Sequence, residues 1–201
     1  MPSPPSSEGD PERLRDIAWM RGVQNGDAEA LRSLIQEYQH RVAAAVARMA
    51  GSSCDPEEVA HEVFVRVWRS AHRYQPSAKL SSWLFTIARN LVLNDVRYRQ
   101  RHPHVSRDIV AEDGHVRDDI TPDTSARQPD VVLLESELQQ AIDDALQQLP
   151  ENQRTAIILR RYEQSTYEEI AMVLGITVPA VKSLLFRART SLREFLREYL
   201  E

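Results

Sequence analysis

The feature that most constrains this chain is a stretch near its middle that cannot form a core. Between residues 108 and 144 there are eleven Asp and Glu against two Arg, a local charge of −9. From about 106 to 129 large apolar residues are scarce, and Gly114, Pro122 and Pro129 interrupt any regular element. Such a segment buries too little apolar surface to offset its ordering entropy. We therefore predict an acidic flexible linker at 106–130.

This linker divides the 201 residues into two small folded domains, expected at 12–105 and 131–201. The polar, Pro- and Ser-rich residues 1–11 lack the basic start and apolar run of a signal peptide, and they predict a disordered leader. The longest near-apolar stretch, 42–47, is far too short to span a bilayer. We expect a cytoplasmic protein without membrane insertion.

Both predicted domains have helical periodicity. Leu34, Tyr38, Val42 and Val46 recur at four-residue spacing until Gly51. Next come Asp55-Pro56 and two glutamates, a combination typical of a helix start, and this helix should run to about Ser70. Ser81 or Ser82 is expected to cap a third helix that runs to about Arg101. Since no long alternating run suggests a sheet, the predicted fold class is all-α.

The second half carries the pattern of a helix-turn-helix. An apolar stripe from Leu134 to Leu149 is stopped by Pro150. Thr166 and Glu169 form a predicted capping box, Gly175 suits a left-handed turn, and Thr177 is expected to cap the next helix. A short helix, a glycine turn and a second helix make up this unit. Its expected small core is Ile170, Ala171, Leu174, Ile176, Val181 and Leu185.

Basic residues gather where nucleic acid could lie. Residues 175–193 hold four bases and no acid, and residues 87–107 hold five bases against Asp95 alone. The first set fits a recognition helix in a major groove, although a solvated basic face is the simpler alternative. Trp83 beside the second set fits a platform for unpaired bases or, equally, a core position, whereas Phe64 and Trp68 are expected in the core. The net charge of −5 alone argues against nucleic acid, but outside residues 108–144 the charge is +4.

Other chemistry is weakly encoded. Glu57, Glu58 and Glu62, or the pair His102 and His104, would serve a helical hydrolase only in a desolvated pocket, and the sequence indicates none. We predict no catalytic residue, no metal site and no cofactor. The single cysteine, Cys54, cannot form an internal disulfide, and its place at a helix start could lower its pKa.

Several motifs, taken in order, resemble the extracytoplasmic-function (ECF) sigma factors of the sigma-70 family of bacterial RNA polymerase. They are DPEEVAHEVFVRVW at 55–68, WLFTIARN at 83–90 with Arg97, LPENQR at 149–154, YEEIA at 167–171, VKS at 181–183 and FRAR at 186–189. The resemblance covers nearly all of residues 12–198. It implies that 12–105 is region 2, which binds core polymerase and the −10 element, and that 131–201 is region 4, a helix-turn-helix for the −35 element.

The resemblance also implies site residues and partners. The expected partners are core RNA polymerase through its β′ and β subunits, promoter DNA, and an anti-sigma factor. The residues implied for core polymerase are Asp55, Glu58, Glu62 and Phe64. Those implied for the −10 element are Trp83, Arg89, Asn90, Asn94, Arg97, Arg99 and Arg101. Those implied for the −35 element are Thr177, Ala180, Lys182, Ser183, Phe186, Arg187 and Arg189.

Some positions depart from the family pattern. His61 stands where Gln is common, a change that is compatible with polymerase docking. Pro179-Ala180 replaces a frequent Gly-Thr and Leu184 replaces a frequent Arg, so the chain lacks side chains that could contact a phosphate or base of the −35 element. A rival hypothesis from the same residues is a stand-alone helix-turn-helix regulator with no need of polymerase. We also hypothesise that the acidic linker competes for the basic faces, so that the free protein binds DNA poorly.

Overall fold

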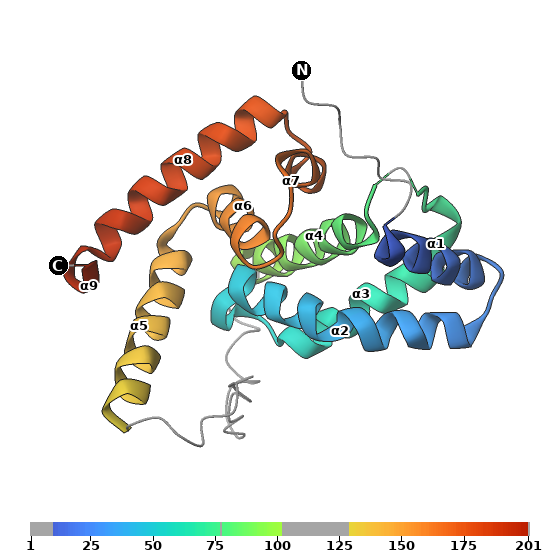
Figure 1. Cartoon of the computed structure of the whole chain (residues 1–201), viewed down its shortest axis with the longest axis horizontal. Coiled ribbons are helices and arrows are strands. Elements are labelled where there is room, and N and C mark those ends of the chain that lie inside the picture. The colour runs from blue at the N-terminus through green and yellow to red at the C-terminus, as the bar shows by residue number, and fades with distance from the viewer. Residues whose placement is uncertain (1–9, 77, 102–128, 201) are drawn as a thin grey trace.

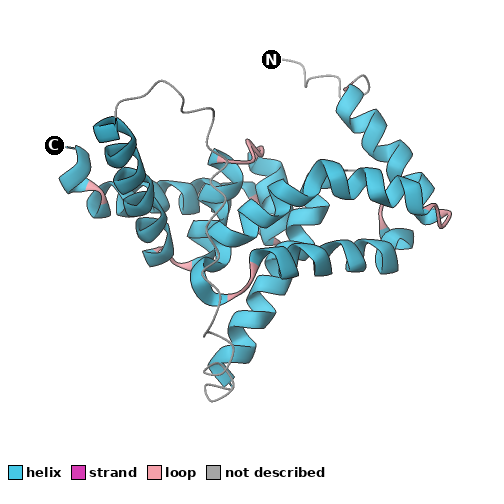
Figure 2. Cartoon of the chain, turned by 90° about the horizontal axis from the view of Figure 1, so that it is seen from below, coloured by secondary structure: helices cyan, strands magenta, loops and turns pink. Residues whose placement is uncertain are grey.

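The computed structural model describes residues 10–76, 78–101 and 129–200, and every regular element in these ranges is a helix (Figure 2). This confirms the all-α prediction. Nearly all of the predicted leader and linker, residues 1–9 and 106–128, lie outside the described residues. We refer to the helices of residues 10–101 as the N-terminal lobe and to those of residues 129–200 as the C-terminal lobe (Figure 1).

The N-terminal lobe begins each of its first three α-helices with an aspartate. Asp10, Asp27 and Asp55 each accept a hydrogen bond from the backbone N–H two residues later, which satisfies an otherwise unpaired donor. The elements are α1 (Pro11–Gln24), α2 (Ala28–Ala50), η1 (Gly51–Ser53), α3 (Pro56–Ser70), η2 (Ala71–Arg73) and α4 (Leu80–Arg101). α2, α3 and α4 pack on one another, and α1 lies along α2.

The predicted N-terminal boundaries agree with most of these elements. α2 ends at Ala50 and is capped by Gly51, whose φ of 60° favours glycine, and the Asp55-Pro56 start of α3 is confirmed. The predicted serine cap of α4 is wrong, because the helix begins at Leu80 and Ser82 is buried inside it. α1 was not predicted, although its start, Asp10-Pro11-Glu12, has the same pattern as the start of α3, Asp55-Pro56-Glu57.

The C-terminal lobe contains the predicted helix-turn-helix. Its elements are α5 (Pro129–Gln148), α6 (Glu151–Arg161), α7 (Tyr167–Leu174), α8 (Val178–Phe195) and α9 (Arg197–Leu200). Both hydrogen bonds of the capping box are present: the Thr166 hydroxyl accepts from the Glu169 N–H, and the Glu169 carboxylate accepts from the Thr166 N–H. Gly175 takes the left-handed conformation at φ 66°. Thr177 occupies the N-cap position of α8, but within the described residues its side chain makes no capping bond, so its predicted role is only half correct.

The two lobes are in contact. α6 lies on α2, α7 lies on α4, and buried side chains of both lobes form one continuous apolar cluster (Figure 1). Ile170, Val181 and Leu185 of the predicted helix-turn-helix core are at most 1% exposed. Within the described residues, no single helix is long and apolar enough to cross a membrane, although α7 and α8 together pass that test as a pair bent by 95°.

Candidate protein and nucleic-acid interfaces

The first candidate surface is an apolar groove between α2 and α3. Its volume is about 530 Å³. Trp68 is 41% exposed at this groove, so its predicted place in the core is wrong, whereas Phe64 is only 4% exposed, as a core residue should be. Both apolar and polar side chains line it: Leu31, Ile35, Phe64, Val65, Trp68, Gln39, Glu57, His61 and Arg69. A partly exposed tryptophan beside other apolar side chains in a groove is typical of a protein-binding surface.

The acids expected to bind polymerase lie beside this groove rather than in its lining. Asp55 is occupied as the N-cap of α3. Glu58 is exposed in the first turn, and Glu62, one turn later, forms an ion pair with Arg66 at 2.9 Å. Of the four residues implied for core polymerase, only Phe64 lines the groove, whereas Glu57, His61 and Trp68 line it and were not among the four. α3 therefore presents an apolar row flanked by an acidic one.

The second candidate surface is α4. Trp83 is half-buried, and its ring lies against that of Tyr74 with the centroids 5.3 Å apart at 53°. Trp83 thus packs against the core and remains partly accessible at the surface of α4. Asn90, Asn94, Arg97 and Arg101 are exposed, whereas Arg99 is tied to Asp95 at 2.9 Å. Arg89 differs from these exposed residues, because its guanidinium bonds Asn152 and Glu151 of α6 and is only 14% exposed.

A cationic cavity lies where the end of α3 meets α4. Its volume is about 290 Å³. Its lining combines basic side chains with a hydroxyl, an amide and one apolar side chain: Arg66, Arg69, His72, Arg73, Ser70, Asn90 and Ile87. Arg69 and Arg73 can attract a phosphate, whereas Arg66 is paired with Glu62, and the Asn90 amide can pair with the edge of a base. Asn90 was predicted. The basic residues were not, because they precede α4 in sequence and converge on it only in the fold.

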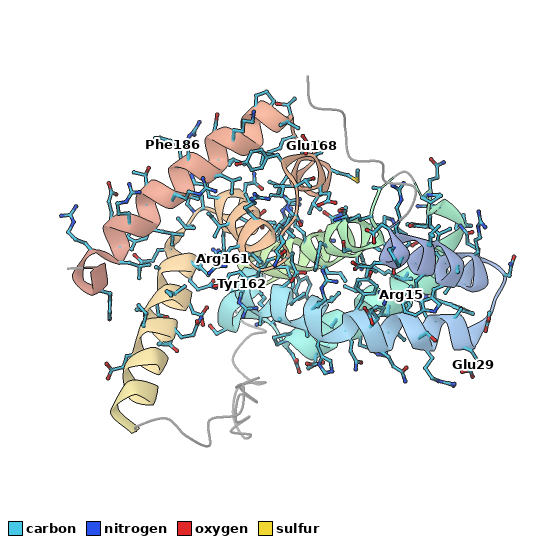
Figure 3. The ribbon with its side chains drawn as sticks, in the orientation of Figure 1. Arg15, Glu29, Arg161, Tyr162, Glu168 and Phe186 are labelled. Atoms are coloured by element: carbon cyan, nitrogen blue, oxygen red, sulfur yellow. The ribbon has the colours of Figure 1, made fainter. Side chains whose placement is uncertain are left out.

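The third candidate surface is the outer face of α8. Val181, Leu185 and Ala188 are buried against α6 and α7, which turns the opposite face outward. Figure 3 shows Phe186 projecting from α8 away from the rest of the lobe, and it is 71% exposed. The exposed predicted residues are Thr177, Lys182, Ser183, Phe186, Arg187 and Arg189, and Ala180 is half-buried. Leu184 is half-buried and packs against the core, so it is not part of the exposed outer face of α8.

Two carboxylates with a raised pKa, Asp16 and Glu163, lie outside these three surfaces. Burial raises the pKa of Asp16, which accepts a bond from the Tyr38 hydroxyl. Burial also raises the pKa of Glu163, against the opposing effect of Arg41. Asp16 thus joins α1 to α2, and Glu163, between α6 and α7, is joined to α2 through Arg41. Among the described residues, no group of three or more His, Cys, Asp or Glu side chains could hold a metal ion, and His102 and His104 lie outside them.

Cys54 differs from its expected chemistry. Burial, assisted by the negative charge of Asp95, raises the pKa of the thiol to about 11. The helix start was expected to lower this pKa, but removal of the sulfur from water outweighs it. Cys54 is therefore a protonated, half-buried thiol at neutral pH.

Comparisons with known proteins agree with these surfaces. The sigma-70 region 2 family matches residues 34–102, and the sigma-70 region 4 family matches residues 139–192. The RNA polymerase sigma-H factor of Pseudomonas aeruginosa is 32% identical over 186 residues, covering 92% of this chain and 96% of its own length. The ECF RNA polymerase sigma-E factor of Haemophilus influenzae is 35% identical over 185 residues, covering 89% and 93%.

A solved structure has the same fold at low identity. CnrH, in complex with the cytosolic domain of CnrY, superposes with a TM-score of 0.65 at 21% identity, covering 94% of this chain and 99% of CnrH. The family matches fall on the helices that carry the groove, the cationic cavity and the exposed face of α8. The chain therefore belongs to the extracytoplasmic-function sigma factors of the sigma-70 family, proteins that direct RNA polymerase to initiate transcription.

Proposed function

We propose that the α2–α3 groove is the main docking site for core RNA polymerase. Trp68, 41% exposed, lines this groove together with apolar Leu31, Ile35 and Phe64, and this arrangement supports burial of a partner side chain. The adjacent acids Glu58 and Glu62 supply a negative rim, which complements a basic partner surface and speeds encounter. This division between an apolar anchor and an acidic rim is the single observation that carries the proposal.

We propose that the non-template strand of the −10 element lies along α4 and enters the cationic cavity. Asn90 and Ile87 line this cavity with three arginines, so one unstacked base and its phosphate find an amide, an apolar surface and positive charge together. Unstacking costs a few kcal/mol per step, and about 1–3 kcal/mol returns for each base stacked on protein. Trp83 supplies the accessible part of its ring, and Asn94, Arg97, Arg99 and Arg101 continue the track.

We propose that α8 enters the major groove of the −35 element. Its outward Lys182, Ser183 and Arg187 can reach base edges and phosphates, while the exposed Phe186 can contact a thymine methyl group. Arg189 and Thr177 lie toward the two ends of the contact. Leu184, half-buried where the family often has Arg, offers no charge.

On this proposal the protein catalyses no reaction of its own and acts in the cytoplasm as a subunit of polymerase. An anti-sigma factor is a further expected partner. CnrH was solved with the cytosolic domain of CnrY, and the RpoE of Bartonella quintana was solved with the anti-sigma factor NepR. We expect such a partner to compete with polymerase for the groove at Trp68, and Trp68→Ala to weaken both.

Run-off transcription tests the proposal directly. Purified core polymerase is incubated with a genomic promoter library, with and without this protein, and new transcript starts are mapped. New starts that share sequence elements near −10 and −35 are expected. The stand-alone regulator instead predicts tight binding to duplex DNA without polymerase and no new starts.

A further inference from the structure

The segment that follows α3 carries two side chains of the cationic cavity. We call its described part, residues 71–76, the cavity loop; it begins with η2 and leads toward α4. His72 and Arg73 of this loop are exposed and line the cavity. Ala71 and Tyr74 instead belong to the buried apolar cluster. The placement of the two basic side chains therefore depends on what holds the cavity loop.

The backbone of the cavity loop is held by α1. Gln24 is the last residue of α1, and its side-chain amide donates to the Ala71 carbonyl at 3.0 Å and to the Tyr74 carbonyl at 3.2 Å. Arg13, near the start of the same helix, donates to the Pro76 carbonyl at 3.0 Å. One helix therefore contacts the cavity loop at three carbonyls, through two side chains that lie about three turns apart.

A buried tyrosine connects the cavity loop to both α1 and α4. Tyr74 is 7% exposed, and its ring packs against Trp83 of α4. Burial raises the pKa of the Tyr74 hydroxyl, and the negative charge of Asp16 on α1 raises it further. The ring that contacts Trp83 thus belongs to the same loop that α1 holds, so a shift of this loop changes the surface that Trp83 offers to the −10 strand.

α1 is in turn fixed on α2, along which it lies (Figure 1). The Tyr38 hydroxyl donates to Asp16 at 2.7 Å, and Arg15 pairs with Glu37 at 2.8 Å. These contacts set the position of α1 independently of the cavity loop. The two family matches begin at residues 34 and 139, so neither of them covers α1. α1 therefore has the geometry of a support that reaches from α2 to the loop.

We propose that α1 positions the cavity for the −10 strand, with Gln24 as its main positioning residue. By holding two of its carbonyls, Gln24 keeps the cavity loop in one conformation, so that His72 and Arg73 are in place before the strand arrives. Gln24 itself lines neither the groove nor the cavity. Its effect comes from preorganisation, because a strand that must first order the loop binds more weakly. This inference rests on the proposed function of the cavity.

Substitutions at Gln24 test the proposal. Gln24→Met removes the amide donor and preserves the length and the zero charge of the side chain. Because Gln24 is exposed, this substitution opens no cavity in the core. The matched control is Gln148→Met, at the exposed last residue of α5. Gln24→Lys returns a donor to the same position, and Gln148→Lys controls for the charge that it adds.

Each variant is assembled with core polymerase, and fluorescence anisotropy measures binding of the holoenzyme to a labelled single strand. The strand is the non-template −10 sequence of a promoter found by run-off transcription. Gln24→Met should bind it at least fivefold more weakly than Gln148→Met, and Gln24→Lys should match Gln148→Lys within twofold. Equal binding by the two Met variants overturns the proposal. A parallel fall in polymerase affinity and thermal midpoint of Gln24→Met also overturns it, because that result means loss of structure.

A second set of variants separates positioning from a general effect. In a protein that carries His72→Ala and Arg73→Ala, the side chains to be positioned are gone, so adding Gln24→Met should change strand binding less than twofold. A fivefold effect there contradicts action through the cavity loop. If Asn90→Ala weakens strand binding and Gln24→Met does not, only the positioning role fails. If Asn90→Ala has no effect, or run-off transcription is absent, the proposed function of the cavity fails and this inference fails with it.

Discussion

The Tyr38 hydroxyl donates a hydrogen bond of 2.7 Å to Asp16, and both side chains lie in the interior of the N-terminal lobe. Tyr38 is fully buried on α2, and Asp16 is 5% exposed on α1. The bond fixes α1 on the helix that also forms one wall of the groove. A buried carboxylate without a donor is expensive, so this pair determines how firmly α1 is held.

Tyr38→Phe should therefore destabilise the protein. The ring still fills its site, but the Asp16 carboxylate loses its donor, which costs about 1–3 kcal/mol of unfolding free energy. Urea denaturation followed by circular dichroism measures this cost. Tyr199→Phe is the control, because Tyr199 is 55% exposed. Equal effects of the two substitutions would contradict the role of the buried bond.

The free energy of unfolding should depend on pH through the same carboxylate, Asp16. Burial raises the pKa of Asp16 above its ordinary value, and the Tyr38 bond opposes this only in part. Folded protein thus holds a proton that unfolded protein releases, so the contribution of Asp16 is full below about pH 4 and is lost as pH rises through the raised pKa.

Asp16→Asn removes this titration. The unfolding free energy of wild type minus that of the variant should fall as pH rises from about 4 toward neutrality, and it should level off once Asp16 is ionised. Urea titrations of both proteins at several pH values measure the difference. A difference that rises with pH means that Asp16 is stabilised as an anion and contradicts this account.

The local parts of this fold could be predicted from the sequence because their causes are local. The Asp55 cap, the Thr166–Glu169 box and the Gly175 turn each depend on residues within four positions of one another. The buried Asp16 depends on Tyr38, 22 residues away, so no spacing rule identified it. The hydrogen bonds from Gln147 to the Arg48 carbonyl and from Arg154 to the Met49 carbonyl join residues about a hundred positions apart, so their geometry exists only after both lobes have folded.

The parts of the candidate site that one helix supplies could also be predicted, whereas those that several elements form together could not. The charge pattern of α8 predicted an outward basic face, because one helix supplies both its buried and its exposed rows. The cationic cavity needs the end of α3, η2 and α4 together, and only Asn90 of its lining was predicted. Trp68 was expected in the core because its spacing matches the apolar row, but α2 leaves that end of the row uncovered.

Trp68→Ala should weaken binding to core polymerase by tenfold or more with a modest loss of stability, since the side chain is 41% exposed in the free protein. Phe64→Ala is a poorer probe of docking, because Phe64 is 4% exposed and its removal should cost about 3–5 kcal/mol of stability. Biolayer interferometry with immobilised core polymerase gives the affinities. Leu14→Ala, at an exposed α1 position away from the groove lining, should bind as wild type does.

Gly175→Ala should destabilise the helix-turn-helix through its backbone alone. Nothing lies within 4 Å of a Cβ at this position, but φ is +66°, a conformation that costs a residue other than glycine about 1–2 kcal/mol. Gly175→Asn should cost less, because Asn tolerates the left-handed region better. Thermal denaturation of the three proteins ranks them. If alanine and asparagine have equal effects, side-chain contacts rather than φ govern the turn.

Arg187→Ala should weaken recognition of the −35 element and leave polymerase affinity unchanged. Arg187 is exposed on α8 of the C-terminal lobe, whereas the groove lies in the N-terminal lobe. Loss of one base or phosphate contact costs about 1–3 kcal/mol, which corresponds to a roughly 5- to 150-fold fall in binding. The promoters found by run-off transcription provide the test, with −35 duplexes carrying single base changes. If Arg187 reads a base, the variant loses discrimination at one position. If Arg187 contacts a phosphate, the variant binds all duplexes more weakly, and its binding depends less on salt.

The control is Arg197→Ala, in α9 beyond the recognition helix, which should match wild type. Equal loss of polymerase affinity and −35 binding in Arg187→Ala would contradict the separation of the two surfaces.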